Sequence, residues 1–249
     1  MRYFFTCCLC IIVLLASCNS TNTNNNKAVQ DNLHAKGFSV THHNGYTVVE
    51  ISNPWKSNAI LQRFTLVPSS ATLPDSLPDG AVIRTPVKSA LVYSAVHANA
   101  IKELGHLSSI TGVCDAQYFT IPEITSGVAD GTIINAGSSM APVAERIIAL
   151  SPDIVLLSPY QNSGYAEHIP KGIPIVECAD YMESSPLGRA EWIKLFGLLF
   201  NEEQKADSIY SHVVDRYTNM KKLIESEPNR PKILSENIIN GTWYVPGGN

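Results

Sequence analysis

The most continuous hydrophobic run of the chain lies at its N-terminus. Residues 3–17 are largely apolar, follow the positive charge of Arg2 and end in small residues. This pattern is typical of a secretory signal, and the run is too short to span a bilayer stably. We therefore expect residues 1–17 to direct export of the protein.

A cysteine and a polar tract follow this run. Residues 15–18, Leu-Ala-Ser-Cys, resemble the bacterial lipobox, which implies that Cys18 is lipidated at its sulfur and becomes the mature N-terminus. The alternative is an ordinary signal cleaved nearby, with Cys18 as a spare thiol. Residues 19–26 contain no apolar side chain. Residues 18–36 are therefore predicted to be a lipidated, flexible tether that holds a folded domain near a membrane.

Short strand-like segments occupy residues 37–80. Residues 37–51 predict two strands about Asn44-Gly45, because this dipeptide suits a turn whose two central residues need positive φ. A third strand is expected over residues 61–67, and residues 68–80 contain three prolines and are expected to form a surface loop. We interpret residues 37–80 as an N-terminal β-hairpin extension.

From Ala81 the pattern changes to apolar strands that alternate with helices. Strands are expected at residues 88–93, 109–114, 154–157 and 172–178, and helices at 95–104 and 142–150. Near-continuous apolar strands separated by helices favour a parallel sheet that is covered on both faces. The predicted fold class is α/β, with a Rossmann-like lobe over residues 81–186 and its four strands in the order 2-1-3-4.

A long helical pattern follows that lobe. The stripe Trp192, Leu195, Phe196 and Leu199 continues at helical spacing through Ala206, Ile209, Val213, Tyr217, Met220 and Ile224. Asn201 is interpreted as the N-cap of the second, longer helix, which would measure about 37 Å at 1.5 Å per residue. Residues 187–228 are thus predicted to be spacer helices. Residues 229–249 are too few to enclose another core, and we expect them to begin a second α/β lobe that is incomplete in this sequence.

Composition excludes several classes of protein. A hydrophobic fraction of 45% is too high for a disordered chain, and a net charge of −4 without any Lys/Arg run is unlike a dedicated nucleic-acid binder. The sequence holds no phosphate-loop, nucleophile-elbow or zinc-protease motif, and its seven histidines form no spaced ligand set. No resident cofactor or metal is predicted, and binding is favoured over catalysis.

Two cysteines remain once the signal and the lipid site are set aside, Cys114 and Cys178. In the strand order 2-1-3-4 they lie three strands apart, about 14 Å at 4.8 Å per strand. A disulfide needs Cα atoms within about 7 Å. Both thiols are therefore predicted to be free.

Aromatic residues gather where the predicted strands end. In an open parallel sheet, ligands bind beyond the carboxyl ends of the strands, which here are Ser94 and residues 115–119, 158–161 and 179–181. Aromatic rings at a cleft mouth suit a large, flat, partly apolar ligand. The candidate ligand-binding residues in these segments are Tyr118, Phe119, Tyr160 and Tyr181. Trp243 and Tyr244 add a second candidate wall if their strand belongs to a facing lobe.

Residues 144–155, AERIIALSPDIV, resemble the helix–strand signature of the periplasmic binding proteins for vitamin B12, iron-siderophores and haem, which feed ABC importers. The resemblance covers about residues 82–249 and does not reach the hairpin region 37–67. It implies two α/β lobes joined by one long helix, with the ligand in the cleft between them. Ser139 stands where the B12-binding pattern has an aromatic residue before the docking helix, which weakens a cobalamin assignment.

The same resemblance implies that a glutamate on each lobe docks onto arginines of the permease. The first glutamate falls on Glu145, and a carboxylate in the first turn of a helix is favoured by the helix dipole. The alternative is a helix-start glutamate with no partner. The second docking glutamate would lie beyond Asn249.

These observations predict a solute-binding lipoprotein of an ABC importer, anchored through Cys18 at a bacterial envelope membrane and facing the periplasm. It is expected to be a monomer, not an enzyme, and to deliver an iron-siderophore, cobalamin or haem to the permease. Three alternatives remain: a carrier of bare zinc or manganese, an envelope enzyme on a Rossmann-like scaffold, and a lipoprotein that binds a partner protein.

Overall fold

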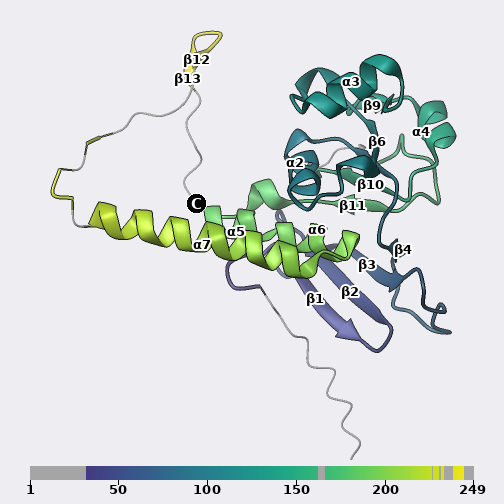
Figure 1. The fold of residues 1–249 in the computed structure, drawn as a ribbon, viewed down its shortest axis with the longest axis horizontal. Coiled ribbons are helices and arrows are strands. Elements are labelled where there is room, and N and C mark those ends of the chain that lie inside the picture. Colours follow the sequence, from purple (N-terminus) through teal and green to yellow (C-terminus); the bar gives the residue numbers. More distant parts are fainter. Residues whose placement is uncertain (1–31, 162–165, 226, 230, 233–237, 244–249) are drawn as a thin grey trace, which may run out of the picture.

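The computed structural model describes residues 32–161, 166–225, 227–229, 231–232 and 238–243 (Figure 1). The predicted signal, most of the predicted tether with Cys18, and Tyr244 lie outside these ranges. None of the helices within them combines the length and the hydropathy that a membrane span requires.

The N-terminal region is a four-stranded sheet in the order β1-β2-β3-β4. Strands β1 (Phe38–His43), β2 (Tyr46–Ser52) and β3 (Ile60–Pro68) are antiparallel, and Asn44-Gly45 forms the turn between the first two. This confirms the predicted hairpin and third strand.

The start of the α/β region differs from the prediction. We expected the α/β pattern to begin at Ala81, whereas Ala81–Thr85 forms β4 and pairs in parallel with β3. The loop over residues 69–80 is long enough to carry the chain back along β3, which a parallel neighbour requires. Gly80 allows this entry, because its φ is +137° and a Cβ there would clash with the Arg63 carbonyl oxygen.

A parallel sheet forms the second layer, in the order β11-β10-β5-β6-β7. Its strands are β5 (Ala90–Val92), β6 (Ile110–Val113), β7 (Ile134–Asn135), β10 (Ile154–Leu157) and β11 (Ile175–Glu177). The predicted order of four strands is confirmed. The sequence pattern missed β7, because two residues, one of them polar, leave no periodic signal. It also missed the helix before it, α3 (Pro122–Asp130).

Helices connect these strands on both faces of the sheet (Figure 1). Helix α2 (Ala95–Glu103) begins at Ser94, whose side chain accepts the Val96 N–H. Helix α4 (Ala144–Leu150) begins two residues later than Pro142, where we predicted it to start, because Pro142 belongs to a small hairpin of β8 (Gly137–Ser138) and β9 (Ala141–Pro142). Three short 3₁₀ turns complete the lobe: η2 (Leu107–Ser109), η3 (Ala116–Tyr118) and η4 (Asp180–Met182).

The predicted spacer region contains three helices, α5 (Pro186–Glu191), α6 (Ile193–Phe200) and α7 (Glu203–Glu225). The Asn201 N-cap prediction is wrong: Asn201 ends α6 in the left-handed conformation, with φ 56°. Of the predicted stripe on α7, Ala206 is buried, whereas Met220 is 62% exposed; the other buried residue of this helix, Tyr210, lies outside the stripe. The C-terminal half of α7 extends beyond the rest of the fold (Figure 1). A last hairpin pairs β12 (Ile238–Ile239) with β13 (Thr242–Trp243).

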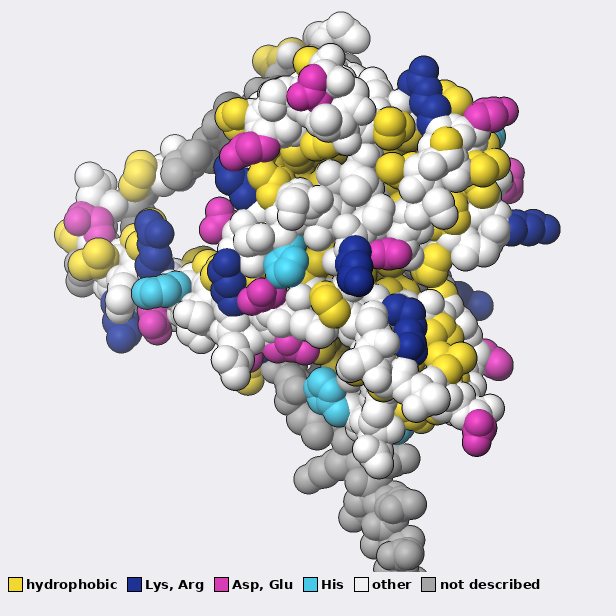
Figure 2. Space-filling model, turned by 45° about the vertical axis from the view of Figure 1, so that its right-hand side comes forward, with side chains coloured by type: hydrophobic (Ala, Val, Ile, Leu, Met, Phe, Trp, Pro, Cys, Tyr) yellow, Lys and Arg dark blue, Asp and Glu magenta, His cyan; other side chains and the backbone are white. Residues whose placement is uncertain are grey.

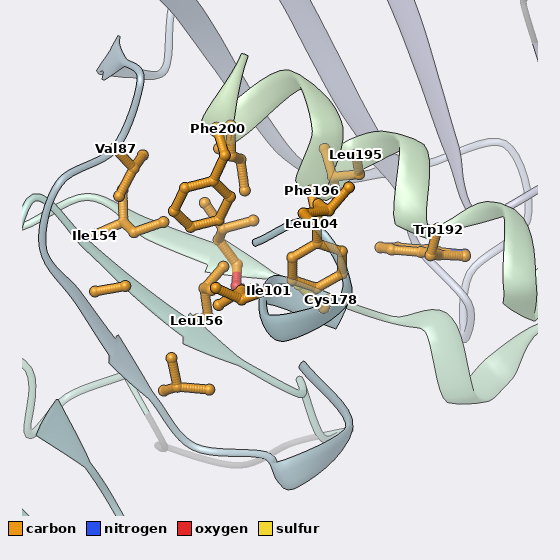
Figure 3. Packing of buried hydrophobic residues seen from close by; sticks show 14 of the residues in the cluster. Val87, Ile101, Leu104, Ile154, Leu156, Cys178, Trp192, Leu195, Phe196 and Phe200 are labelled. Carbon is orange, nitrogen blue, oxygen red and sulfur yellow. Dashed lines mark hydrogen bonds between the residues drawn. The ribbon is translucent and has the colours of Figure 1, made fainter. Parts of the chain in front are cut away.

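The main hydrophobic core joins the two sheets through α6. Leu195, Phe196 and Phe200 of α6 pack with residues of α2 and β10 (Figure 3). A second cluster, which includes Leu91 of β5 and Ile147 of α4, covers the opposite face of the parallel sheet. The predicted sheet covered on both faces is confirmed, and the antiparallel sheet shares its core.

Polar contacts also tie the N-terminal region to the lobe. The Gln62 amide on β3 donates to the Ile175 carbonyl at 2.5 Å and accepts the Glu177 N–H at 3.0 Å, so it covers the free edge of β11. The fully buried Glu191 accepts the backbone N–H groups of residues 33–35 at 2.7–2.9 Å. Residues 33–35, which we predicted to be part of the flexible tether, are thereby bound to α5, and Ala35 is buried.

Candidate ligand-binding site

A cavity of about 410 Å³ opens at the carboxyl ends of β5, β6 and β10. Its walls are Tyr93, Ser94, Ala95, Asp115, Tyr118, Ser139, Met140, Leu157, Ser158 and Tyr160. This is the edge of the parallel sheet at which the sequence predicts a ligand. Three separate strand–loop junctions and the β8–β9 hairpin converge there, as expected for ligand sites of open α/β sheets.

Asp115 connects two of these segments. It follows β6 directly and has a left-handed backbone, with φ 50°, a conformation that aspartate tolerates better than most residues. Its N–H donates to the Gly137 carbonyl at 2.8 Å, and its Oδ2 accepts the Ser139 N–H at 3.1 Å. Sequence reasoning placed Asp115 in a strand-end segment and selected only the aromatic residues there. The position of Asp115 directly after an apolar strand could have identified it as a candidate site residue.

Two of the predicted aromatic residues line the cavity. Tyr118 is 71% exposed and Tyr160 is 50% exposed, so both rings present area to a ligand. Tyr181 is not among the lining residues, but its hydroxyl donates to the Pro159 carbonyl at 2.6 Å and so supports the segment that carries Tyr160.

The other predicted aromatic residues lie elsewhere. Phe119 is only 4% exposed and belongs to the main core, so it does not line the cavity. The 3₁₀ turn η3 ends at Tyr118, and the chain then becomes extended, which turns the next side chain inward. Trp243 lies in the β12–β13 hairpin, outside the cavity wall.

Two groups beside Asp115 are uncharged near neutral pH: Tyr93, which lines the cavity, and Cys114, which precedes Asp115 in the chain. Burial raises the pKa of Tyr93 far above its ordinary value, and the neighbouring Cys114 and Asp115 raise it further. Burial likewise raises the pKa of the Cys114 thiol to about 12. Both groups are therefore protonated near neutral pH, and the buried Cys114 thiol carries little of the reactive thiolate form. Cys114 and Cys178 are both free and buried, as predicted.

Glu145 lies in the first turn of α4 and is exposed, the position that the prediction gave it. Apolar side chains flank it, among them Val143 and Ile148, which is 60% exposed one turn along the helix. The Arg146 guanidinium donates to the Asn135 carbonyl at 2.7 Å and ties α4 to β7. In the view of Figure 2, acidic and basic side chains are interspersed, so that face carries no large patch of one sign.

Comparison with known proteins adds to this geometry. The chain is 28% identical over 281 residues to an uncharacterized lipoprotein of Methanocaldococcus jannaschii, covering 97% of this chain and 67% of that protein. It is 27% identical over 197 residues to a second uncharacterized lipoprotein of that organism, covering 76% of this chain and 48% of the relative. The chain thus spans about two thirds of the first relative and about half of the second.

A solved structure of a siderophore binding protein, bound to a complex of two acinetobactin molecules and ferric iron, is 23% identical, with a TM-score of 0.47. That likeness covers 58% of this chain and 51% of the other. The family described as periplasmic binding protein matches residues 95–249, more than half of the chain. The chain therefore belongs to the periplasmic binding protein family.

Proposed function

We propose that this protein is the solute-binding component of an ABC importer and that it binds a metal chelate or corrinoid in the cavity at the carboxyl ends of β5, β6 and β10. The observation that carries the proposal is that cavity, with the exposed rings of Tyr118 and Tyr160, in a member of a binding-protein family. Exposed rings beside small polar side chains suit a large ligand with flat apolar surfaces.

The chemistry of the cavity favours binding over catalysis. Tyr93 in its wall and the adjacent Cys114 stay protonated near neutral pH, and Asp115, the carboxylate of the described lining, accepts the Ser139 N–H. A carrier of bare zinc or manganese would need several converging ligands, and the part of the chain that the structure describes contains no group of three or more His, Cys, Asp or Glu suited to a metal. A chelate that brings its own ligands to the metal needs no such group.

Docking and anchoring complete the proposal. Glu145, exposed between apolar side chains at the start of α4, is proposed to meet an arginine of the permease. The lipid at Cys18 is proposed to keep the protein at an envelope membrane, and the relatives that are described as lipoproteins support this. The proposed ligands are iron-siderophores, haem and cobalamin.

Fluorescence titration of the mature protein tests the function. Cyanocobalamin, haem and ferric siderophores are each added while tryptophan and tyrosine emission is recorded, and saturable quenching by at least one is expected. Tyr118→Ala and Tyr160→Ala should each weaken that binding about tenfold, in line with the loss of one well-packed ring. Tyr46→Ala is the matched control, because Tyr46 stacks on His43 in the N-terminal hairpin.

Other results of the titration would favour one of the alternative functions. Zinc or manganese that stays bound through dialysis, without a response to any chelate, would identify a carrier of bare metal. No response to either class would leave a protein-binding lipoprotein or an enzyme and would contradict the proposal.

A further inference from the structure

The charge of the cavity wall is unbalanced. Of the residues that line the cavity in the described part of the chain, Asp115 is the charged one, and the others are serines, tyrosines and apolar residues. The described lining therefore contains no lysine, arginine or histidine that could balance an acidic group on a ligand. A carboxylate without a cationic neighbour attracts positive groups and repels negative ones over the few ångströms that a bound ligand would occupy.

The position of Asp115 directs its charge at the cavity. Its Oδ2 accepts the Ser139 N–H, while Oδ1 accepts no hydrogen bond from any described residue. The charge acts on the neighbouring groups, since it adds to the raised pKa values of Tyr93 and Cys114. Oδ1 is thus left to accept a hydrogen bond from a ligand, and a cationic N–H donor forms the strongest bond of this kind.

The aromatic walls favour the same sign of charge. Tyr118 and Tyr160 are both largely exposed beside Asp115. The face of a tyrosine ring attracts a cation and disfavours an anion, because its quadrupole is negative above the ring. The two rings and the carboxylate therefore all favour a cationic group over an anionic group on the ligand.

We propose that Asp115 makes this site selective for neutral or cationic chelates, of the kind that carry an amine, and against chelates with net negative charge such as tris-catecholates and polycarboxylates. This inference rests on the proposed function and specifies the ligand class of the same cavity. Asp115 acts as a specificity-determining residue that contacts the ligand.

A matched pair of probes tests the inference. Ferrioxamine B carries a pendant ammonium group, and its N-acetylated form is neutral with the same iron-binding groups. The wild type should bind the cationic form about tenfold more tightly, which corresponds to about 1.4 kcal/mol. Asp115→Asn should bind both forms equally, because the amide oxygen still accepts the Ser139 N–H and asparagine tolerates the left-handed backbone. Asp79→Asn, which removes a charge from an exposed loop residue outside the cavity wall, should keep the wild-type preference.

Salt provides a second measurement on the unmodified protein. Raising the sodium chloride concentration should weaken binding of the cationic form and leave the neutral form unchanged, because screening acts on the charge interaction alone. This readout does not depend on the folding of the Asp115→Asn variant.

Different results would contradict the charge selectivity and the proposed function. Equal affinity of the wild type for both forms, tighter binding of an anionic tris-catecholate, or an unchanged preference in Asp115→Asn overturns the charge selectivity alone. A failure of ferrioxamines, tris-catecholates, cobalamin and haem all to bind overturns the proposed function, and the selectivity with it.

Discussion

Neighbouring residues have different tasks at the mouth of the cavity. Asp115 supplies charge, Tyr118 supplies an exposed ring, and Phe119 fills the core. The 3₁₀ turn between them has about three residues per turn, so consecutive side chains point in different directions. Aromatic residues after a predicted strand therefore predict the region of a cavity, whereas the turn geometry decides which ring lines it.

Glu191 yields a prediction about stability. Its carboxylate is fully buried and accepts three backbone N–H groups, with Lys194 Nζ at 3.2 Å. Glu191→Gln should lower the free energy of unfolding by about 2–3 kcal/mol at pH 7, because charge-assisted hydrogen bonds are replaced by weaker ones and an amide N–H₂ lacks acceptors there. Urea denaturation measures this, and Glu145→Gln, an exposed glutamate, is the control.

The pH dependence of that loss has a defined sign. Desolvation alone would raise the pKa of Glu191, but the N–H groups of residues 33–35 and Lys194 outweigh it and lower the pKa below its ordinary value. The stabilisation is therefore complete above the unfolded pKa of about 4.3 and is lost as the pH falls through the lower folded pKa. Wild type and Glu191→Gln should converge in stability in this acid range, and a constant difference down to pH 2 would contradict the assignment.

At the scale of elements, the sequence predicts helices and strands correctly where their hydrophobic pattern is periodic and local. The core strands β5, β6 and β10 are short apolar runs, and α2 has its Ser94 cap and a glycine just after it. The strand β7 has two residues, and β4 joins the sheet of its sequence predecessor. The residues of β7 and β4 do not by themselves reveal the first strand or the pairing of the second, because both depend on the neighbouring strand.

The junction of α6 and α7 gives a prediction at this scale. A Cβ on Gly197 would lie 2.7 Å from the Ala206 Cβ, so the glycine lets the two helices approach closely. Gly197→Ala should lower the free energy of unfolding by about 1–3 kcal/mol through overpacking, despite the gain of about 1 kcal/mol in helix propensity. Thermal or urea unfolding measures this loss.

A double variant provides the control. Ala206→Gly in the Gly197→Ala background should recover part of the lost stability, since it moves the methyl group from one helix to the other and restores the space between them. A double variant that is as unstable as the sum of the two single variants would show that the helices do not meet at this pair.

At the scale of the whole molecule, two sheets share one core, and the cavity proposed as the ligand site lies at the edge of the parallel sheet. The Gln62 amide joins β3 to the edge of β11, and α6 packs between the layers. The N-terminal sheet, which lies outside residues 95–249 matched by the family, thus stabilises the lobe without lining its cavity. The long helix α7 leads away from both sheets.

Transport with the cognate importer tests Glu145. Glu145→Ala should leave the dissociation constant of the ligand within about twofold, because the residue does not line the cavity, and should lower ligand uptake about tenfold or more by removing a charged contact. Uptake into proteoliposomes is the measurement. Glu123→Ala is the matched control, since Glu123 is an exposed glutamate in the first turn of α3. A loss of ligand affinity in Glu145→Ala would contradict its role in docking.

The sequence by itself determined the fold class, the order of four parallel strands, the free thiols and the edge of the sheet where a cavity opens. These follow from hydrophobic periodicity, capping residues and strand connectivity, which are local or follow general rules of chain topology. Only the tertiary structure decided that Phe119 is buried, that β4 extends the N-terminal sheet and that Asp115 is the charged group of the cavity wall. Each of these depends on which distant segments pack together, and burial and electrostatic fields are properties of that packing.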